Sequence, residues 1–138
     1  MVSFRSKLEA RVAKVDSLLC VGLDPHEREL RSENKGDAAF TFCKNLIEAT
    51  SAVACCYKPN AAFFEALGDD GMKTLRRVIA IIPEDIPILL DVKRGDIDST
   101  AIAYAKACYT HLGADAVTLS PLMGWDSVSP FVTGTLVG

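Results

Sequence analysis

The hexapeptide 91–96 (DVKRGD) places charges of both signs at the end of an apolar run, residues 86–90. On an extended strand, residues two apart share a face, so we expect Asp91 and Lys93 to hold a carboxylate and an ammonium side by side. Burying an ion costs several kcal/mol unless the ion is paired. Charges of both signs at the end of a hydrophobic strand therefore indicate a functional site. A surface ion pair at a strand end is the alternative, because such pairs are common.

The elements that must position these charges alternate between short apolar runs and stretches with helical spacing. We expect strands at 18–23, 54–58, 86–92 and 116–119, and helices at 1–16, 37–53, 60–67, 72–82 and 97–112. Asp96, Asp98 or Ser99 would cap the last of these helices. This alternation favours an α/β fold with a parallel sheet and crossover helices.

Polar residues end all four expected strands: Asp24, Lys58, Asp91 with Lys93, and Ser120. Parallel α/β barrels and open α/β sheets place active sites at the carboxyl ends of their strands. The repeated pattern therefore favours a site over an isolated surface pair.

Several of these residues also have a purely structural interpretation. Asp24 precedes Pro25 and would start a turn, Lys58 would be a solvated strand end, and Asp96 would be only a helix cap. Their joint occurrence at successive strand ends argues against taking each one separately. Arg94 is left without a role.

The composition excludes several classes of partner. The chain has 138 residues, 49% of them hydrophobic, and a formal net charge of -3, which suits one globular domain or a piece of a larger one. It carries no basic field for nucleic acid or an anionic membrane, so any anionic ligand must be held by local cations.

Targeting and metal signals are weak as well. His26 and His111 are far apart in the sequence, which argues against a metal site. The five cysteines are odd in number and have no C-x-x-C spacing, so we expect buried free thiols in a reducing compartment. There is no apolar stretch of about 20 residues, and acidic residues within 1–16 argue against a presequence. We expect a cytoplasmic protein.

Three segments together resemble orotidine 5'-phosphate decarboxylase: 21–25 (VGLDP), 57–60 (YKPN) and 91–97 (DVKRGDI). Residues 117–127 (VTLSPLMGWDS) are similar to the fourth strand and following loop of one branch of that family. A D-x-K-x-x-D pattern alone is shared with sugar-phosphate decarboxylases and aldolases of related barrels. Asp24 and Lys58 in their contexts favour orotidine 5'-phosphate decarboxylase.

The resemblance implies the first half of a TIM-type (β/α)8 barrel, with about four β-strands and crossover helices. It covers 17–134, after an amino-terminal helix at 1–16 and before a divergent tail at 135–138. Such a barrel needs about 250 residues and usually binds phosphate after strands seven and eight. We therefore expect a truncated, alternatively spliced or wrongly delimited product that lacks the family's phosphate-binding residues.

The resemblance also implies roles for the strand-end residues. Asp24 and Lys58 would contact ribose hydroxyls, and Lys58 would also flank the catalytic carboxylate. Asp91 would face the substrate carboxylate, and Lys93 would deliver the proton to the ring carbon that loses carbon dioxide. Ser120 is expected to join the substrate-binding residues.

Further implications concern partners. Asp96, Ile97 and Thr100 would reach across the interface of a homodimer into the neighbour's site, where Asp96 would complete an alternating network with Lys58, Asp91 and Lys93. No cofactor is required. The parent protein is expected in some lineages to carry an orotate phosphoribosyltransferase domain.

The expected chemistry is electrostatic. Loss of carbon dioxide from the pyrimidine leaves a carbanion that no adjacent carbonyl delocalises, so a fixed positive charge, Lys93, must stabilise and then protonate it. Asp91 would either position Lys93 or repel the substrate carboxylate, and the sequence does not choose between these accounts. Two other functions stay open: a non-catalytic fragment that binds a partner subunit through the Asp96 helix, and a related sugar-phosphate lyase.

Overall fold

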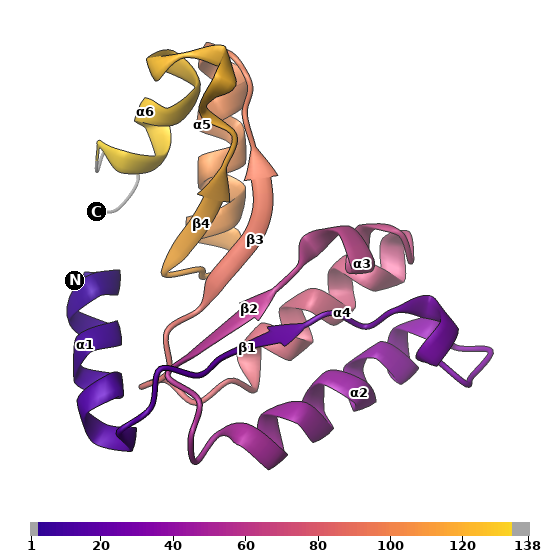
Figure 1. Cartoon of the computed structure of the whole chain (residues 1–138). Coiled ribbons are helices and arrows are strands. Elements are labelled where there is room, and N and C mark those ends of the chain that lie inside the picture. The colour runs from indigo at the N-terminus through magenta and orange to yellow at the C-terminus, as the bar shows by residue number, and fades with distance from the viewer. Residues whose placement is uncertain (1–2, 134–138) are drawn as a thin grey trace.

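A computed structural model describes residues 3–133 as four parallel strands with helices packed beside them (Figure 1). The elements in chain order are α1 (Phe4–Val15), β1 (Cys20–Leu23), η1 (Glu27–Glu29), α2 (Lys35–Thr50), β2 (Cys56–Pro59), α3 (Ala61–Glu65), α4 (Asp69–Ala80), β3 (Leu89–Arg94), α5 (Asp98–Lys106), η2 (Ala107–His111), β4 (Ala116–Leu119), η3 (Pro121–Met123) and α6 (Trp125–Val132). All the expected strands and helices are present, with ends shifted by a few residues.

Two differences from the expected elements matter for the site. The third strand was expected at 86–92 but runs from Leu89 to Arg94, so Lys93 lies within it. The segment 125–132, for which no element was expected, forms α6 although Pro130 lies inside it. A helix of two turns tolerates this proline because tertiary packing, with Phe131 buried against α5, outweighs the weak local preference.

The sheet is built from two parallel pairs joined at a narrow seam. β1 pairs with β2 from Cys20↔Cys56 to Leu23↔Pro59, and β3 pairs with β4 starting at Leu89↔Ala116. Between β2 and β3, isolated bridges join Tyr57 to Ile88 and Asn60 to Asp91. The strand order is therefore β1-β2-β3-β4, and all carboxyl ends lie at the same edge.

The core lies between the strands and helices α2 to α4. Its largest fully buried side chains include Leu23, Tyr57, Phe64 and Leu90. The Tyr57 hydroxyl, which would be costly to bury unpaired, donates to the carbonyl of Ile47 and contacts the Thr50 hydroxyl at 2.8 Å. This packing fixes β2 and β3, which carry the charged residues at their ends.

Helix α1 is attached through a buried arginine. Arg11 is 6% exposed, and its guanidinium donates to the carbonyls of Ala54, at 3.0 Å, and Ser51 and to the carboxylate of Asp85, at 2.7 Å. Arginine suits this position because its planar fork presents five donors in fixed directions. The side chain therefore connects α1 to the segments that precede β2 and β3.

The cysteines differ in one respect from the expectation of buried thiols. Four are buried, but Cys20 is exposed. Cys20 begins β1, which lies at the edge of the described sheet and is paired only with β2. Its exposure follows from that edge position, which the apolar sequence around it did not reveal.

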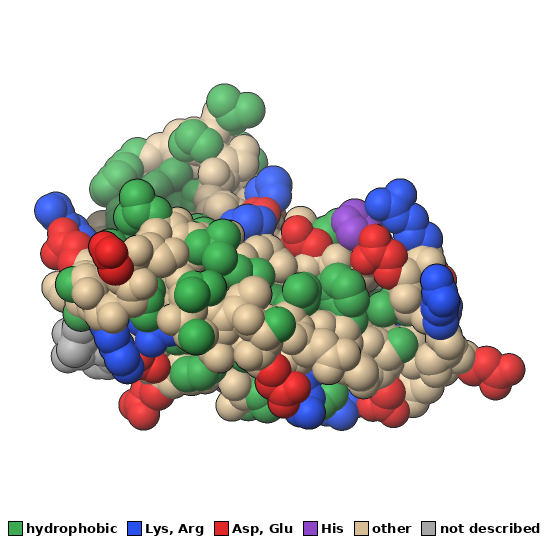
Figure 2. All heavy atoms as spheres, turned by 60° about the horizontal axis from the view of Figure 1, so that its bottom comes forward, with side chains coloured by type: hydrophobic (Ala, Val, Ile, Leu, Met, Phe, Trp, Pro, Cys, Tyr) green, Lys and Arg blue, Asp and Glu red, His purple; other side chains and the backbone are tan. Residues whose placement is uncertain are grey.

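Charge on the face shown in Figure 2 is mixed, with Lys and Arg side chains interspersed among Asp and Glu. Within residues 3–133 no helix is both long enough and apolar enough to cross a membrane. The proposed divergent tail, 135–138, lies outside the described residues, and the division of the chain at 16 and 134 stays a prediction.

Replacing Arg11 by Met should lower the free energy of unfolding by about 2–3 kcal/mol, because buried carbonyl oxygens lose their donors. Lys14→Met is the matched control. Lys14 pairs with the same Asp85 carboxylate at 2.7 Å but is 65% exposed, so its loss should cost less than about 1 kcal/mol. Urea unfolding followed by circular dichroism measures both. Equal losses in the two variants would show that burial does not determine the contribution of Arg11.

Candidate active site

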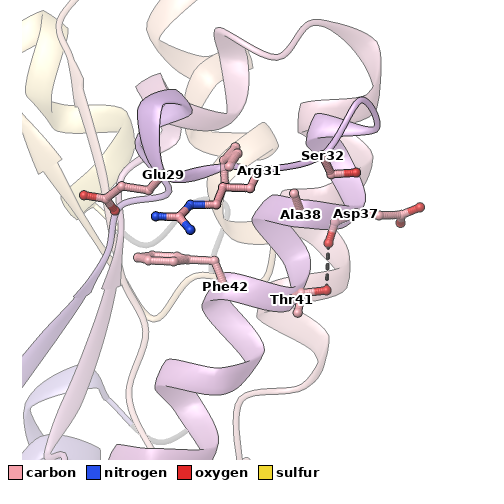
Figure 3. Close-up of a pocket in the computed structure, with 8 residues that line it drawn as sticks. Glu29, Arg31, Ser32, Asp37, Ala38, Thr41 and Phe42 are labelled. Carbon is pink, nitrogen blue, oxygen red and sulfur yellow. Dashed lines mark hydrogen bonds between the residues drawn. The ribbon is translucent and has the colours of Figure 1, made fainter.

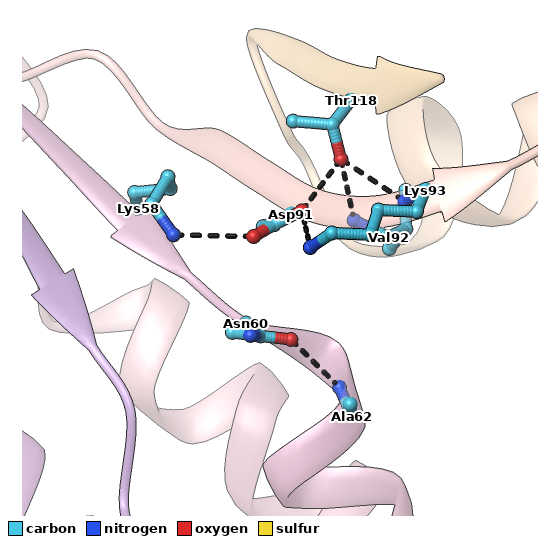
Figure 4. A network of polar contacts seen from close by, with 7 residues as sticks. All are labelled: Lys58, Asn60, Ala62, Asp91, Val92, Lys93 and Thr118. Atoms are coloured by element: carbon cyan, nitrogen blue, oxygen red, sulfur yellow. Dashed lines mark hydrogen bonds and ion pairs between the residues drawn. The ribbon is translucent and has the colours of Figure 1, made fainter. Parts of the chain in front are cut away.

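The charged residues meet around a single carboxylate, that of Asp91 in the middle of β3 (Figure 4). Asp91 Oδ1 accepts hydrogen bonds from Lys93 Nζ and from Thr118 Oγ1, both at 2.7 Å, and Oδ2 accepts one from Lys58 Nζ at 3.2 Å. The expected contact between Asp91 and Lys93 is present, and Lys58 joins it from β2. We call Lys58, Asp91, Lys93 and Thr118 the Asp91 cluster.

Burial within the Asp91 cluster is uneven. The side chain of Asp91 is 9% exposed, whereas those of Lys58 and Lys93 are 31% and 68% exposed. The two lysine side chains are thus partly open to solvent while the aspartate side chain that binds them is buried. With two cations around one anion, the cluster carries a local net charge of +1 and is suited to an anionic ligand.

Opposing effects act on the carboxyl group of Asp91. Burial by itself raises its pKa, but hydrogen bonds from Lys93, Thr118 and Lys58, together with the charge of Lys58, outweigh burial and lower the pKa to about 2. Asp91 is therefore ionised throughout the physiological range. A permanently charged partner keeps both lysines in place.

The contact between Asp91 and Lys93 does not come from a regular strand. The pairing of β3 with β4 shifts between Leu90 and Arg94, and Lys93 has a left-handed backbone with φ of 45°. The rule that residues two apart share a face of a strand therefore predicted the contact between Asp91 and Lys93 correctly. It did not take into account the irregular backbone through which the contact forms. An irregularity of this kind next to a site commonly redirects a side chain.

Thr118 was not predicted as a site residue. It lies inside the expected fourth strand, two residues before Ser120, and its hydroxyl contacts Asp91, Val92 and Lys93. The one sequence feature that could have indicated a role for Thr118 was its position on the strand expected to lie next to β3. Threonine is common in β-strands because of its β-propensity, so nothing in the local sequence distinguishes Thr118 from a threonine without a role in the site.

Asp24 and Ser120 lie at the same edge but outside the Asp91 cluster. Asp24 follows β1, and its Oδ1 is buried with no hydrogen-bond partner among the described residues. Ser120 donates its backbone N–H to the carbonyl of Arg94 at 2.7 Å. A side chain at Gly95 would place its Cβ only 2.6 Å from the Ser120 carbonyl oxygen, so a glycine is needed where the two strands end.

The residues expected to reach a neighbouring subunit do not join the Asp91 cluster of their own chain. Asp96 accepts the backbone N–H of Ile97 at 2.8 Å, and Ile97 and Thr100 are exposed at the start of α5. The expected side-chain cap was wrong, because α5 begins after Ile97 without a side-chain cap bond. Their reach across a dimer interface stays a prediction.

Arg94, left without a role by the sequence, has structural contacts. It forms an ion pair with Glu65 of α3 at 2.7 Å, and its guanidinium lies 4.6 Å from the ring centroid of Tyr104 of α5. Both contacts are between β3 and flanking helices. Arg94 therefore connects elements of the fold rather than contributing to the Asp91 cluster.

A hollow of about 340 Å³ lies between the segment after β1 and helix α2 (Figure 3). Its lining includes Glu29, Arg31, Thr41 and Phe42, and no member of the Asp91 cluster. The catalytic candidates therefore lie at an open strand edge, apart from this hollow. Among residues 3–133 no group of three or more His, Cys, Asp or Glu side chains is arranged to hold a metal ion.

Parallel strands with flanking helices, and polar residues gathered towards their carboxyl ends, are the arrangement of half of a (β/α)8-type barrel. The sequence model of the orotidine 5'-phosphate decarboxylase / HUMPS family matches residues 17–136, and the chain belongs to this family. The expected fold class is thereby confirmed.

Individual relatives agree with this assignment. The chain is 52% identical over 131 residues to the orotidine 5'-phosphate decarboxylase of Herpetosiphon aurantiacus, covering 94% of this chain and 49% of the relative. The structure of Leishmania donovani OMP decarboxylase matches with a TM-score of 0.86 and 49% identity over 96% of this chain and 50% of that one.

A longer protein from the same organism, Leishmania donovani UMP synthase, matches with a TM-score of 0.87 and 49% identity, over 96% of this chain and 28% of its own. The chain spans about half the length of the curated decarboxylases that it matches.

The stability that ionised Asp91 contributes should disappear in acid. The folded pKa of about 2 lies below the ordinary aspartate value of about 3.9, so the contribution is complete above about pH 5 and is lost as the pH falls towards 2. Unfolding free energies of the wild-type chain and of Asp91→Asn, measured from pH 7 to pH 2, should converge by as much as about 2 kcal/mol. A difference independent of pH would contradict the lowered pKa.

Proposed function

We propose that the chain contributes the proton-donating half of an orotidine 5'-phosphate decarboxylase, which converts orotidine 5'-monophosphate to UMP and carbon dioxide at the end of de novo pyrimidine biosynthesis. The observation that carries this proposal is the Asp91 cluster: two lysines from adjacent strands share one buried carboxylate. The family membership of the chain and the decarboxylase names of its relatives support it.

Lys93 is the proposed proton donor. The side chain of Lys93 is more exposed than that of Lys58, so a ligand can reach Lys93 while Asp91 keeps it oriented. The carbanion left by the departing carbon dioxide would develop beside this positive charge, and a preorganised charge lowers the barrier without the reorganisation that water would require. The same group then transfers its proton to the ring carbon.

Asp91 acts in this proposal mainly by positioning. Its two oxygens hold both lysines, and the lowered pKa keeps Asp91 charged, so the ion pair that orients Lys93 persists. Repulsion between Asp91 and the substrate carboxylate is the other account. The contacts described above support positioning, because each carboxylate oxygen already binds a lysine.

The remaining assignments follow from the family. Asp24 and Lys58 would bind the ribose hydroxyls, and Ser120 would contact the substrate. Asp24 fits this role because a buried oxygen without a partner has a free acceptor for a hydroxyl donor. Asp96, Ile97 and Thr100 would complete the site of a neighbouring subunit in a homodimer.

The wider setting is also part of the proposal. The reaction needs no cofactor, since the fixed charges supply the stabilisation, and the enzyme would be cytoplasmic. The similarity to Leishmania donovani UMP synthase, a longer protein, makes fusion to an orotate phosphoribosyltransferase domain a reasonable arrangement for a parent protein.

The proposal can be tested in a hybrid that joins residues 1–133 of this chain to the half of the Herpetosiphon aurantiacus relative that the chain does not match. The hybrid should convert orotidine 5'-monophosphate to UMP, and Lys93→Ala should lower kcat by at least about 1,000-fold, since both charge stabilisation and proton transfer are lost. Release of UMP is measured directly.

Lys73→Ala is the control, because Lys73 is 72% exposed on α4 and, within residues 3–133, forms an ion pair with Asp70 alone. It should leave kcat unchanged. Near-normal turnover by a folded Lys93→Ala hybrid would overturn the proposal. Cleavage of a keto-sugar phosphate by a hybrid that leaves orotidine 5'-monophosphate intact would instead favour a related lyase.

The 138-residue chain alone should turn over orotidine 5'-monophosphate very slowly or not at all. In barrels of this type the phosphate is usually held after strands seven and eight, and binding energy from that remote group is used at the reacting centre. Turnover by the purified chain at a rate comparable to that of the hybrid would contradict this expectation. Co-purification with a full-length subunit would support the non-catalytic alternative.

A further inference from the structure

We propose that Thr118 is a positioning residue for the decarboxylation, whose hydroxyl holds the irregular segment of β3 in the conformation that brings Lys93 to Asp91. This inference rests on the proposed function. It concerns a residue on β4 that makes no charge pair itself and that acts through Asp91 and Lys93.

The first observation is that one hydroxyl makes three hydrogen bonds (Figure 4). Thr118 Oγ1 accepts the backbone N–H groups of Val92, at 3.1 Å, and Lys93, at 3.0 Å, and it contacts Asp91 Oδ1 at 2.7 Å. A hydroxyl has one proton and two acceptor lone pairs. Since both lone pairs are used by N–H groups, the proton must point to Asp91, and the direction of every bond is determined.

The second observation is the pairing of the two strands. Leu90 pairs with Val117 and Arg94 pairs with Leu119, so the three residues 91–93 of β3 lie opposite the single residue Thr118. The extra residues of β3 lose their backbone partners on β4 over this stretch. The Thr118 side chain replaces those partners for two consecutive N–H groups, which would otherwise be left without an acceptor.

The third observation is the backbone of Lys93, with φ of 45°. A non-glycine residue in the left-handed region is disfavoured by about 1 kcal/mol or more, and it persists only where the surroundings fix it. The bond from Lys93 N to Thr118 supplies such a constraint at the strained residue itself. The same hydroxyl therefore fixes the backbone of the proton donor and the carboxylate that orients its ammonium group.

The substitution that isolates this role is Thr118→Val. Valine keeps the β-branched shape but removes all three hydrogen bonds, whereas Thr118→Ser keeps the hydroxyl and loses only a methyl group. Thr110→Val is the matched control, because Thr110 is exposed on the short helix η2 and lies outside the Asp91 cluster. Thr118→Ala serves as a second variant if valine prevents folding.

The first measurement uses the whole 138-residue chain and does not depend on catalysis. Carbon-13 NMR titration of the Asp91 carboxyl should show its midpoint raised by about one pH unit in Thr118→Val, because one hydrogen bond to the charged form is lost. Thr118→Ser and Thr110→Val should titrate like the wild type. An unchanged midpoint in both folded Thr118→Val and Thr118→Ala would overturn the inference.

The second measurement is turnover by the hybrid described above. Thr118→Val should lower kcat by about 10- to 100-fold with little change in KM, since Lys93 is misplaced in the transition state while ribose and phosphate contacts are kept. Thr118→Ser should recover most of the activity. A purely structural role would instead lower the yield of folded protein and leave kcat per folded molecule unchanged.

The two proposals fail in different ways. If Lys93→Ala abolishes turnover and folded Thr118→Val retains it, the decarboxylase assignment holds and the role of Thr118 is wrong. If the hybrid folds but does not decarboxylate, the proposed function fails, and the NMR titration still decides whether Thr118 orients Asp91.

Discussion

The buried carboxylate of Asp91 is the group on which the arrangement of the site depends. Covering an ionised carboxylate is costly, and three hydrogen bonds from β2, β3 and β4 offset that cost. Each bond fixes one donor relative to the others. The need to pair one buried anion thus determines where the two ammonium groups lie, and it requires that the strands carrying the donors lie next to one another.

The packing beneath the sheet serves the same requirement. Tyr57 and Leu90 are fully buried, and each directly precedes a charged residue, Lys58 or Asp91. Their packing in the core fixes the backbone from which the charged side chains extend. Arg11 connects α1 to the segments leading into β2 and β3. The Asp91 cluster is therefore supported by the hydrophobic core next to it and by buried Arg11 near the amino-terminal ends of β2 and β3.

The sequence predicted what depends on short-range pattern. Apolar runs, helical spacing and polar strand ends were enough to place Lys58, Asp91 and Lys93 at one edge, because parallel strands bring their carboxyl ends together. What could not be predicted depends on contacts between distant residues. The role of Thr118 requires the shifted pairing of β3 with β4, and the exposure of Cys20 requires knowing which strand lies at the edge.

The seam between β2 and β3 has a consequence for how the fold holds together. Only isolated bridges join the two strand pairs there among residues 3–133, whereas β1 pairs with β2 over four consecutive residues and β3 pairs with β4 on both sides of a register shift. The ion pair from Lys58 on β2 to Asp91 on β3 crosses this seam. The side chains of Lys58 and Asp91, which we propose act in the reaction, thus also strengthen the junction between the two strand pairs, in addition to the isolated bridges and the shared core.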